Sequence, residues 1–465
     1  MKNILQPVVD GLKTVFEEEK HAQQKSTIAV LDGVRALAIL FVLAFHIDWT
    51  NKQYFYASWQ ANPLAASVAL AGGTGVTLFF VLSGFLLFMP YAKALLYAGR
   101  WPLARTFYVR RALRIIPGYY LSLLILVLLE ERNYFLPANL PKLGLFLSFL
   151  MDSSGQTFRQ LDGPYWTLAV EWQFYMLLPL LALGVLLLVR RVPLQRRLRA
   201  VTFCLLGVIM LGLSVRFAGL YFQGNPAATV LVPRSVLNVG LFFSYGMTGK
   251  YTEDFAVGML ASLCYIYAQG LPAEHRYTRA LRRLSPWLWG AGLLILVFSA
   301  MWHLQSDPNT PAWPFLGPLM PVYAWLSEML LAWGYGMCIL ALLFGSRALQ
   351  RPFTWLPLRW IGLISYSLYI WHLPFIQLLS TLLALFPGLN FYAGYALYWL
   401  WALLVIFPFC LCYYILVEKP GMKLGDRWRK VIEARHKAHL QLVSAPAVER
   451  QASADPAGAG GKVHV

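Results

Sequence analysis

The chain has 465 residues, of which 58% are hydrophobic and only 13% are charged, and its mean hydropathy is +0.56. This composition excludes an ordinary soluble domain, because the surface of such a domain would be too apolar for water. A net charge of +18 could suggest nucleic-acid binding, but the basic residues fall on alternate sides of the apolar segments, as membrane topology requires. We therefore expect a polytopic membrane protein with no nucleic-acid partner.

Apolar runs of about 20 residues, the length that carries a helix across the hydrocarbon core, recur along the sequence. They predict an all-α bundle of about ten transmembrane helices. In chain order the predicted spans are 28–47, 65–90, 112–129, 166–189, 200–222, 255–269, 287–304, 321–345, 361–382 and 391–416. Most lysines and arginines fall in the inner segments if the N-terminus is cytoplasmic, so we expect both termini to be cytoplasmic.

Three regions follow from this pattern. Residues 1–27 form a cytoplasmic N-terminal segment, and since acidic Glu17–Glu19 interrupt its lysines, no cleavable signal is predicted. Residues 28–416 form the ten-span membrane domain. Residues 417–465 form a cytoplasmic tail whose Ala/Gly-rich end we expect to be partly disordered.

Ionisable side chains within the spans are the best candidates for function, because a charge in hydrocarbon is costly and normally faces a pathway or a site. The first span carries Asp32, Arg35 and His46. Arg35 and His46 are eleven residues apart, which is close to three full turns, so they share one helix face. Alone, each has an ordinary alternative: an arginine snorkels at a span end, and a histidine fills a core. Together they favour a functional site.

Glu171 of the fourth span lies at about the depth of His46. This placement predicts a His46–Glu171 pair in which His46 is the catalytic base and Glu171 fixes its tautomer. The alternative is that Glu171 is neutralised by another polar partner, such as Arg216.

On the predicted inner side, Arg110, Arg111 and Arg114 cluster where the third span begins. Arginines often flank spans there for reasons of topology alone. Arg111 and Arg114 nevertheless share a helix face, and paired hydrogen bonds from them would suit a phosphorylated ligand such as coenzyme A. Ser83 of the second span is a further candidate ligand donor, although the glycines near it indicate close helix packing.

Polar residues also recur along the ninth span. Ser365, Tyr369 and His372 are separated by four and three residues, so they form one stripe that we expect to line a cavity.

The ordered motifs resemble the acyltransferase 3 family of integral membrane O-acyltransferases, over about Val30 to Pro420. The motifs are Leu31-Asp32-Gly33 with Arg35 and His46; Phe79 to Phe85 around Ser83-Gly84; Arg110-Arg111 with Arg114 and Pro117; Trp166-Thr167 with Glu171 and Tyr175; Asp254-Phe255 with Gly258; Ser365-Tyr366-Ser367 with Tyr369, Trp371, His372 and Pro374; and Glu418-Lys419-Pro420. The one mild departure is Thr167, where the family pattern leads us to expect serine.

The resemblance implies an enzyme that moves an acyl group, usually acetyl, from cytoplasmic acyl-CoA to a hydroxyl of an extracytoplasmic sugar, glycolipid or polysaccharide. Acyl-CoA is then a co-substrate, and no permanently bound cofactor and no metal are expected. The family's functional arginine and histidine map onto Arg35 and His46, and its arginine pair maps onto Arg111 and Arg114. The location implied is a bacterial inner membrane, where lipids surround the bundle.

The site we expect has three parts: His46 and Glu171 for catalysis; Arg35, Arg110, Arg111, Arg114 and Ser83 for acyl-CoA; and Asp32, Trp166, Tyr175, Ser365, Tyr369 and His372 around the acceptor side of the cavity. Transfer could be direct or could pass through an acyl group on His46. Some relatives carry an esterase-like domain after the bundle. The tail 417–465 is too short for such a domain, so we expect this chain to act alone or with a separate partner. A transporter that exports an acylated molecule or acyl donor is the alternative function.

Overall fold

The computed structural model describes residues 26–50, 63–307, 313–386 and 391–444. Within these residues the regular elements are helices, and the only extended pairing is an isolated bridge between Val230 and Val232. The predicted all-α class is therefore confirmed. Residues 1–25 and 445–465, on which the predictions for both chain ends largely rest, lie outside the described part.

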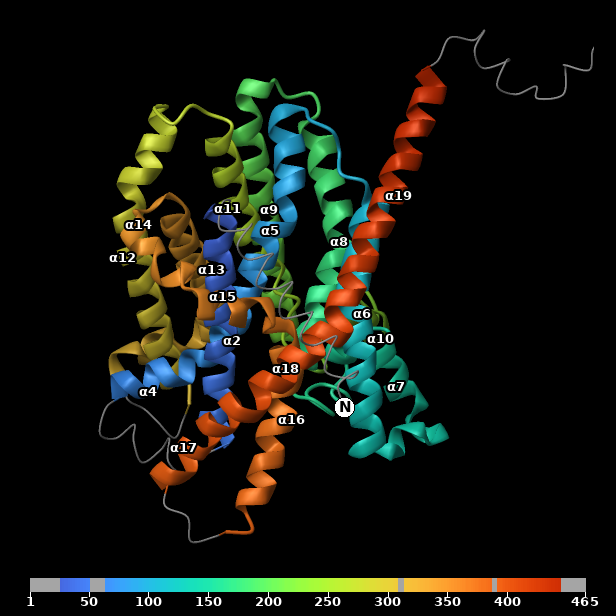
Figure 1. The fold of residues 1–465 in the computed structure, drawn as a ribbon, viewed down its shortest axis with the longest axis vertical. Helices are drawn as coiled ribbons and strands as arrows, with labels where there is room; N and C mark the ends of the chain where they lie inside the picture. The colour runs from blue at the N-terminus through green and yellow to red at the C-terminus, as the bar shows by residue number, and fades with distance from the viewer. Residues whose placement is uncertain (1–25, 51–62, 308–312, 387–390, 445–465) are drawn as a thin grey trace, which may run out of the picture.

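The helices follow one another as antiparallel and crossing rods (Figure 1). They are α2 (Ser26–Thr50), α4 (Pro63–Leu70), α5 (Gly75–Tyr97), α6 (Ala104–Leu129), α7 (Leu140–Leu147), α8 (Tyr165–Val189), α9 (Leu194–Gly224), α10 (Arg234–Ser244), α11 (Thr252–Gln269), α12 (Arg276–Gln305), α13 (Met320–Phe344), α14 (Arg347–Gln350), α15 (Leu356–Leu363), α16 (Ser365–Leu383), α17 (Phe391–Trp401), α18 (Phe407–Tyr413) and α19 (Lys419–Ser444).

Eight helical stretches of the described chain are long and apolar enough to cross a membrane, which makes this an integral membrane protein. A ninth span is obtained if α15 and α16, which meet at 76°, cross together. The predicted count of about ten is higher because it included the segment 255–269. That segment belongs to α11, which is only 18 residues long and carries Glu253 and Asp254 in its first turn.

Helix α11 lies inside the bundle, since most of its side chains are buried. It packs closely against α5 at two reciprocal glycines: a Cβ on Gly84 would collide with the carbonyl of Phe255, and one on Gly258 would collide with the carbonyl of Val81. Phe255 in turn stacks on Phe174 of α8, with ring centroids 3.8 Å apart. These contacts fix α5, α8 and α11 relative to one another.

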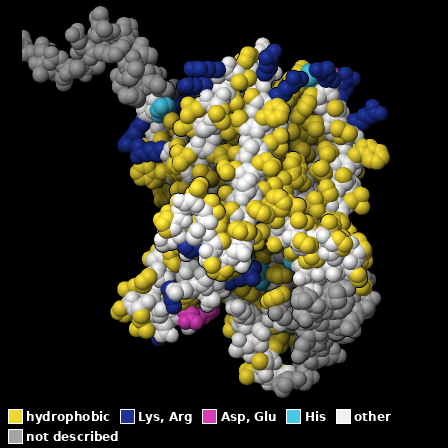
Figure 2. Space-filling model, turned by 180° about the vertical axis from the view of Figure 1, so that it is seen from behind, with side chains coloured by type: hydrophobic (Ala, Val, Ile, Leu, Met, Phe, Trp, Pro, Cys, Tyr) yellow, Lys and Arg dark blue, Asp and Glu magenta, His cyan; other side chains and the backbone are white. Residues whose placement is uncertain are grey.

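Lysine and arginine side chains gather at one end of the molecule, the upper end in Figure 2. Figure 1 shows the α8–α9 and α11–α12 connections at that same end, and α19 extends toward it. Two π-helical turns, Ala402–Ile406 and Tyr414–Glu418, join α17, α18 and α19 into one bent rod. The charge asymmetry suits the predicted cytoplasmic side, and the orientation itself stays a prediction.

Candidate active site

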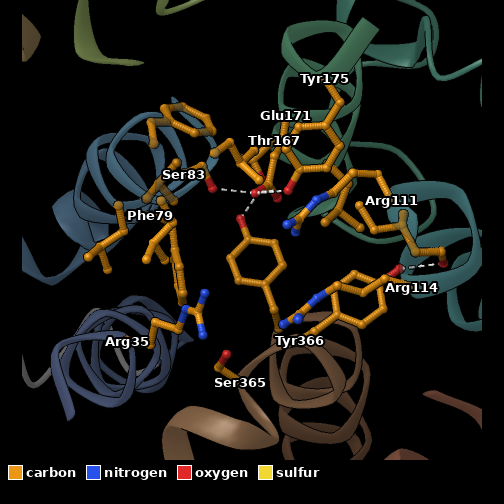
Figure 3. A pocket seen from close by; sticks show the side chains of 18 residues that line it. Arg35, Phe79, Ser83, Arg111, Arg114, Thr167, Glu171, Tyr175, Ser365 and Tyr366 are labelled. Atoms are coloured by element: carbon orange, nitrogen blue, oxygen red, sulfur yellow. Dashed lines mark hydrogen bonds between the residues drawn. The ribbon is translucent and has the colours of Figure 1, made fainter. Parts of the chain in front are cut away.

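A cavity of about 100 Å³ lies among α2, α5, α6, α8 and α16 (Figure 3). Helices far apart in sequence therefore contribute to one space. Eight of the predicted site residues line it: Arg35, Ser83, Arg111, Arg114, Glu171, Tyr175, Ser365 and Tyr369. Figure 3 shows the guanidinium groups of Arg35 and Arg111 entering this space from opposite sides.

The cavity carries more positive than negative charge. Arg35 has an ion pair with Asp32, with Nη1 and Oδ1 3.3 Å apart. Arg111 lies over the ring of Tyr175 at 5.8 Å, and Nη1 of Arg114 lies 3.9 Å from the Met422 sulfur. Neither Arg111 nor Arg114 has an ion pair among the described residues. Because a partly buried guanidinium without a counter-ion is costly, these two side chains suit an anionic ligand.

Glu171 is held by two hydroxyl groups. Ser83 Oγ of α5 donates a hydrogen bond to its Oε1 at 2.6 Å, and the phenol of Tyr175, one turn further along α8, donates to the same oxygen. The predicted His46–Glu171 pair is therefore wrong, since Glu171 points toward α5 and not toward the far end of α2. Arg216, the alternative partner, is bound to Glu253 instead.

His46 has a different partner, His372 of α16. Nε2 of His372 lies 3.2 Å from Nδ1 of His46, and the ring centroids are 4.9 Å apart. Tyr369, one turn before His372, links this pair to the cavity: its ring lines the cavity and lies 5.9 Å from the ring of His372. The Tyr369 hydroxyl is bound to Thr167 at 2.5 Å. The imidazole pair thus lies one aromatic ring beyond the arginine-lined space.

Comparison with known proteins identifies the family. The family model Acyl_transf_3, described as an acyltransferase domain, matches residues 28–417. The chain belongs to the acyltransferase 3 family. No solved structure matches it.

Curated relatives of this acyltransferase include the peptidoglycan O-acetyltransferase OatA of Listeria monocytogenes, which is 27% identical over 76% of the chain and 50% of the relative. The putative peptidoglycan O-acetyltransferase YrhL of Bacillus subtilis is 26% identical over 77% of the chain and 50% of the relative. The acyltransferase MdmB of Streptomyces mycarofaciens is 27% identical over 50% of the chain and 56% of the relative. The chain spans about half the length of these proteins.

Besides His46 and His372, three predicted site residues of the acyltransferase do not line the arginine-lined cavity. Asp32 acts as the ion-pair partner of Arg35. Trp166 packs its ring against Phe158 and Tyr251, with centroids 5.7 Å away in each case. Arg110 points toward α19, where its Nε lies 3.5 Å from Asp426.

Two lining residues with hydroxyl groups, Thr167 and Tyr366, were missing from the predicted site. Thr167 binds Tyr369, and Tyr366 donates a hydrogen bond from its hydroxyl to the Ile115 carbonyl at 2.8 Å. Both belong to the quoted motifs. Tyr366 was overlooked because adjacent residues usually face different ways on a helix, whereas α16 begins at Ser365 and its first turn ends at the cavity.

A second and wider cavity of about 570 Å³ adjoins the first, and Leu86, Leu87 and Arg111 line both. Its cationic lining comes from three helices and the α5–α6 connection: Lys93, Arg100, Arg110, Arg111 and Arg429. Glu433 is the one carboxylate among the described lining residues. Aromatic rings of Tyr91, Trp101 and Phe107 complete the wall. We call this space the basic groove.

Proposed function

We propose that the protein transfers an acyl group, in the simplest case acetyl, from cytoplasmic acyl-CoA to a hydroxyl of an extracytoplasmic carbohydrate. Family membership supports acyl transfer. The names of two relatives support peptidoglycan as the acceptor, and a related cell-envelope polysaccharide or glycolipid has the same hydroxyl chemistry. The bacterial inner membrane is the proposed location, with the basic end of the bundle toward the cytoplasm.

The observation that carries the donor assignment is that neither Arg111, which lines both cavities, nor Arg114, which lines the first, has an ion pair within the described part of the chain. Coenzyme A has phosphate groups at one end and a neutral pantetheine arm at the other. The basic groove offers cations and aromatic rings to the nucleotide end, and the adjoining arginine-lined cavity is the space for the arm in this proposal. Arg111 lies where the two meet.

His46 is the base in this proposal. The acceptor hydroxyl oxygen attacks the thioester carbonyl carbon, the hydroxyl proton moves to the imidazole, the carbon–sulfur bond breaks, and the leaving thiolate takes that proton to give free CoA. General-base catalysis of this kind contributes about 10²- to 10⁴-fold. Glu171, held by Ser83 and Tyr175, lines the same cavity but forms no ion pair with Arg111 or Arg114 among the described residues.

The test uses the purified full chain in lipid nanodiscs with radiolabelled acetyl-CoA and soluble peptidoglycan fragments as acceptor. Arg111→Gln and Arg114→Gln should each raise KM for acetyl-CoA by about tenfold, because each removes charge-assisted hydrogen bonds to the donor. Arg105→Gln is the matched control, since Arg105 lies in the first turn of the same helix, is exposed and lines neither cavity.

His46→Ala should abolish label transfer while leaving acetyl-CoA binding intact. Equal KM values for the Arg111, Arg114 and Arg105 variants would show that acyl-CoA does not bind at Arg111 and Arg114. A label trapped on His46 in the absence of acceptor, together with ping-pong kinetics, would replace direct transfer by an acyl-histidine route.

A further inference from the structure

His372 is the most deeply enclosed polar ring of the site, with none of its surface exposed. Its Nδ1 lies 2.9 Å from the carbonyl oxygen of Leu368 and 3.0 Å from that of Tyr369. A carbonyl oxygen only accepts hydrogen bonds, so this nitrogen carries the proton. A neutral His372 ring therefore has a bare Nε2, and that nitrogen faces His46.

The same reasoning fixes the proton on His46. Its Nδ1 lies 2.9 Å from the carbonyl oxygen of Val42 and 3.2 Å from Nε2 of His372. Both neighbours are acceptors, so Nδ1 of His46 is the donor and its Nε2 has no proton. The reverse assignment would need both nitrogens of His372 protonated, which places a cation without a carboxylate partner at a fully enclosed position.

We propose that His372 is a positioning residue that holds His46 as its Nδ1–H tautomer, so that the bare Nε2 of His46 is the atom that takes the proton from the acceptor hydroxyl. This inference rests on the proposed function. When His46 takes the proton, its Nδ1–H becomes a stronger donor, and Nε2 of His372 is already placed to accept it. The proton then returns from Nε2 of His46 to the departing thiolate, and His372 keeps its own proton throughout.

The partner is a neutral imidazole where many catalytic histidines have a carboxylate. Glu171, the carboxylate that was expected to do this, already accepts bonds from Ser83 and Tyr175. An imidazole accepts the same hydrogen bond without adding a negative charge to an enclosed site. The helix supplies the remaining orientation, because the two carbonyls that fix His372 belong to the preceding turn of α16.

Three substitutions separate positioning from packing. His372→Gln can place its amide oxygen near the site of Nε2 and accept from His46. His372→Asn places its amide near the site of Nδ1, where it satisfies the α16 carbonyls but cannot reach His46. His372→Phe keeps the ring volume and removes both functions.

We expect His372→Asn and His372→Phe to lower kcat by roughly tenfold to hundredfold, as part of the total that general-base catalysis provides. KM for acetyl-CoA should stay unchanged, because His372 lines neither cavity. His372→Gln should keep most of the wild-type kcat. Wild-type kcat in His372→Asn, or a loss in His372→Gln equal to that in His372→Phe, would overturn the inference.

The tautomer is also measured directly, without turnover. Nitrogen-15 NMR of histidine-labelled protein in nanodiscs, with His46 assigned by its loss in His46→Gln, should show a protonated Nδ1 and a bare Nε2 in the wild type and in His372→Gln. A protonated Nε2 on His46 in the wild type overturns the inference. If the wild type transfers no acetyl group at all, the proposed function fails, and the NMR result alone then decides whether His372 sets the tautomer.

Discussion

Arginines lie inside this helical bundle in two different settings. Arg216 of α9 binds Glu253 of α11 at 2.5 Å, with the two side chains only 5% and 2% exposed, and lies 4.6 Å from the ring of Tyr251. Arg111 and Arg114 of α6 face a cavity and have no carboxylate partner in the described chain. Arg216 is buried, whereas Arg111 and Arg114 are half-buried beside the cavity.

The counter-ion makes the difference. Arg216 already has a carboxylate partner and needs no further negative charge, so its role is to join α9 to α11. A charge that lacks such a partner remains available to a ligand that brings negative charge from outside. The sequence could place all three arginines in or beside spans, but only the structure could separate these two kinds.

The largest effect should come from breaking the Arg216–Glu253 ion pair. Arg216→Met leaves Glu253 enclosed without a partner, which should lower the free energy of unfolding by about 3–5 kcal/mol. Denaturation of the protein in detergent micelles measures this, and KM for acetyl-CoA should not change in the protein that remains folded. The double variant with Glu253→Leu should recover most of the loss; a double variant as unstable as the single one would contradict a structural role.

The next largest effect should come from giving the free arginines a carboxylate. Leu86 lines both cavities together with Arg111, so Leu86→Glu supplies the missing negative charge. We expect KM for acetyl-CoA to rise by about tenfold or more, because charge-assisted bonds are worth about 1.5–3 kcal/mol. Leu86→Gln is the control, because glutamine has nearly the same shape as glutamate but no charge. If both variants raise KM equally, obstruction and not charge is the cause.

A smaller effect is expected from releasing Glu171. Ser83→Ala and Tyr175→Phe each remove one hydroxyl from this carboxylate. Ser83→Ala breaks a bond between α5 and α8 and should cost about 0.6 kcal/mol of stability, as hydrogen bonds between membrane helices do on average. Glu171 is then free to turn toward the arginines, so KM for acetyl-CoA should rise as well. Tyr366→Phe loses a bond to a backbone carbonyl and should lower stability similarly with KM unchanged. An equal change of KM in Ser83→Ala, Tyr175→Phe and Tyr366→Phe would contradict a specific role for the Glu171 contacts.

The smallest effect concerns ionic strength. The side chain of Arg110 in the basic groove is 49% exposed, so added salt should screen it, whereas the enclosed Arg216–Glu253 pair should be indifferent. KM for acetyl-CoA should therefore rise a few-fold with added sodium chloride while the melting temperature stays constant. S-acetylpantetheine lacks the nucleotide phosphates and should show no such dependence; a parallel rise for it would argue against the groove.

Much of the bundle was predictable because hydropathy alone identifies a lipid-crossing helix. Helix α11 was the hardest to assign: it is apolar enough to be taken for a span, but its length and its acidic first turn suit a helix enclosed by protein. The bend at Ile364 was also missed, because the break between α15 and α16 contains no proline and only the packing of both helices reveals it.

The sequence predicted which residues belong to the candidate site better than it predicted which of them contact one another. Costly charges and periodic spacing identified Arg35, Arg111 and Glu171 as members of one site, which the cavity brings together. The partners of His46 and Glu171 could not be derived, because two helices at similar depth can face in different directions. His372 was placed in a polar stripe, and only the relation of α2 to α16 shows that it meets His46.

The abrupt turn before Ser365 has an electrical consequence. It places the first turn of α16 at the arginine-lined cavity, among α2, α5, α6 and α8. The aligned peptide dipoles of that helix present about half a positive elementary charge at its start. The helix dipole does not titrate. It should therefore attract an anionic group equally at low and at high pH.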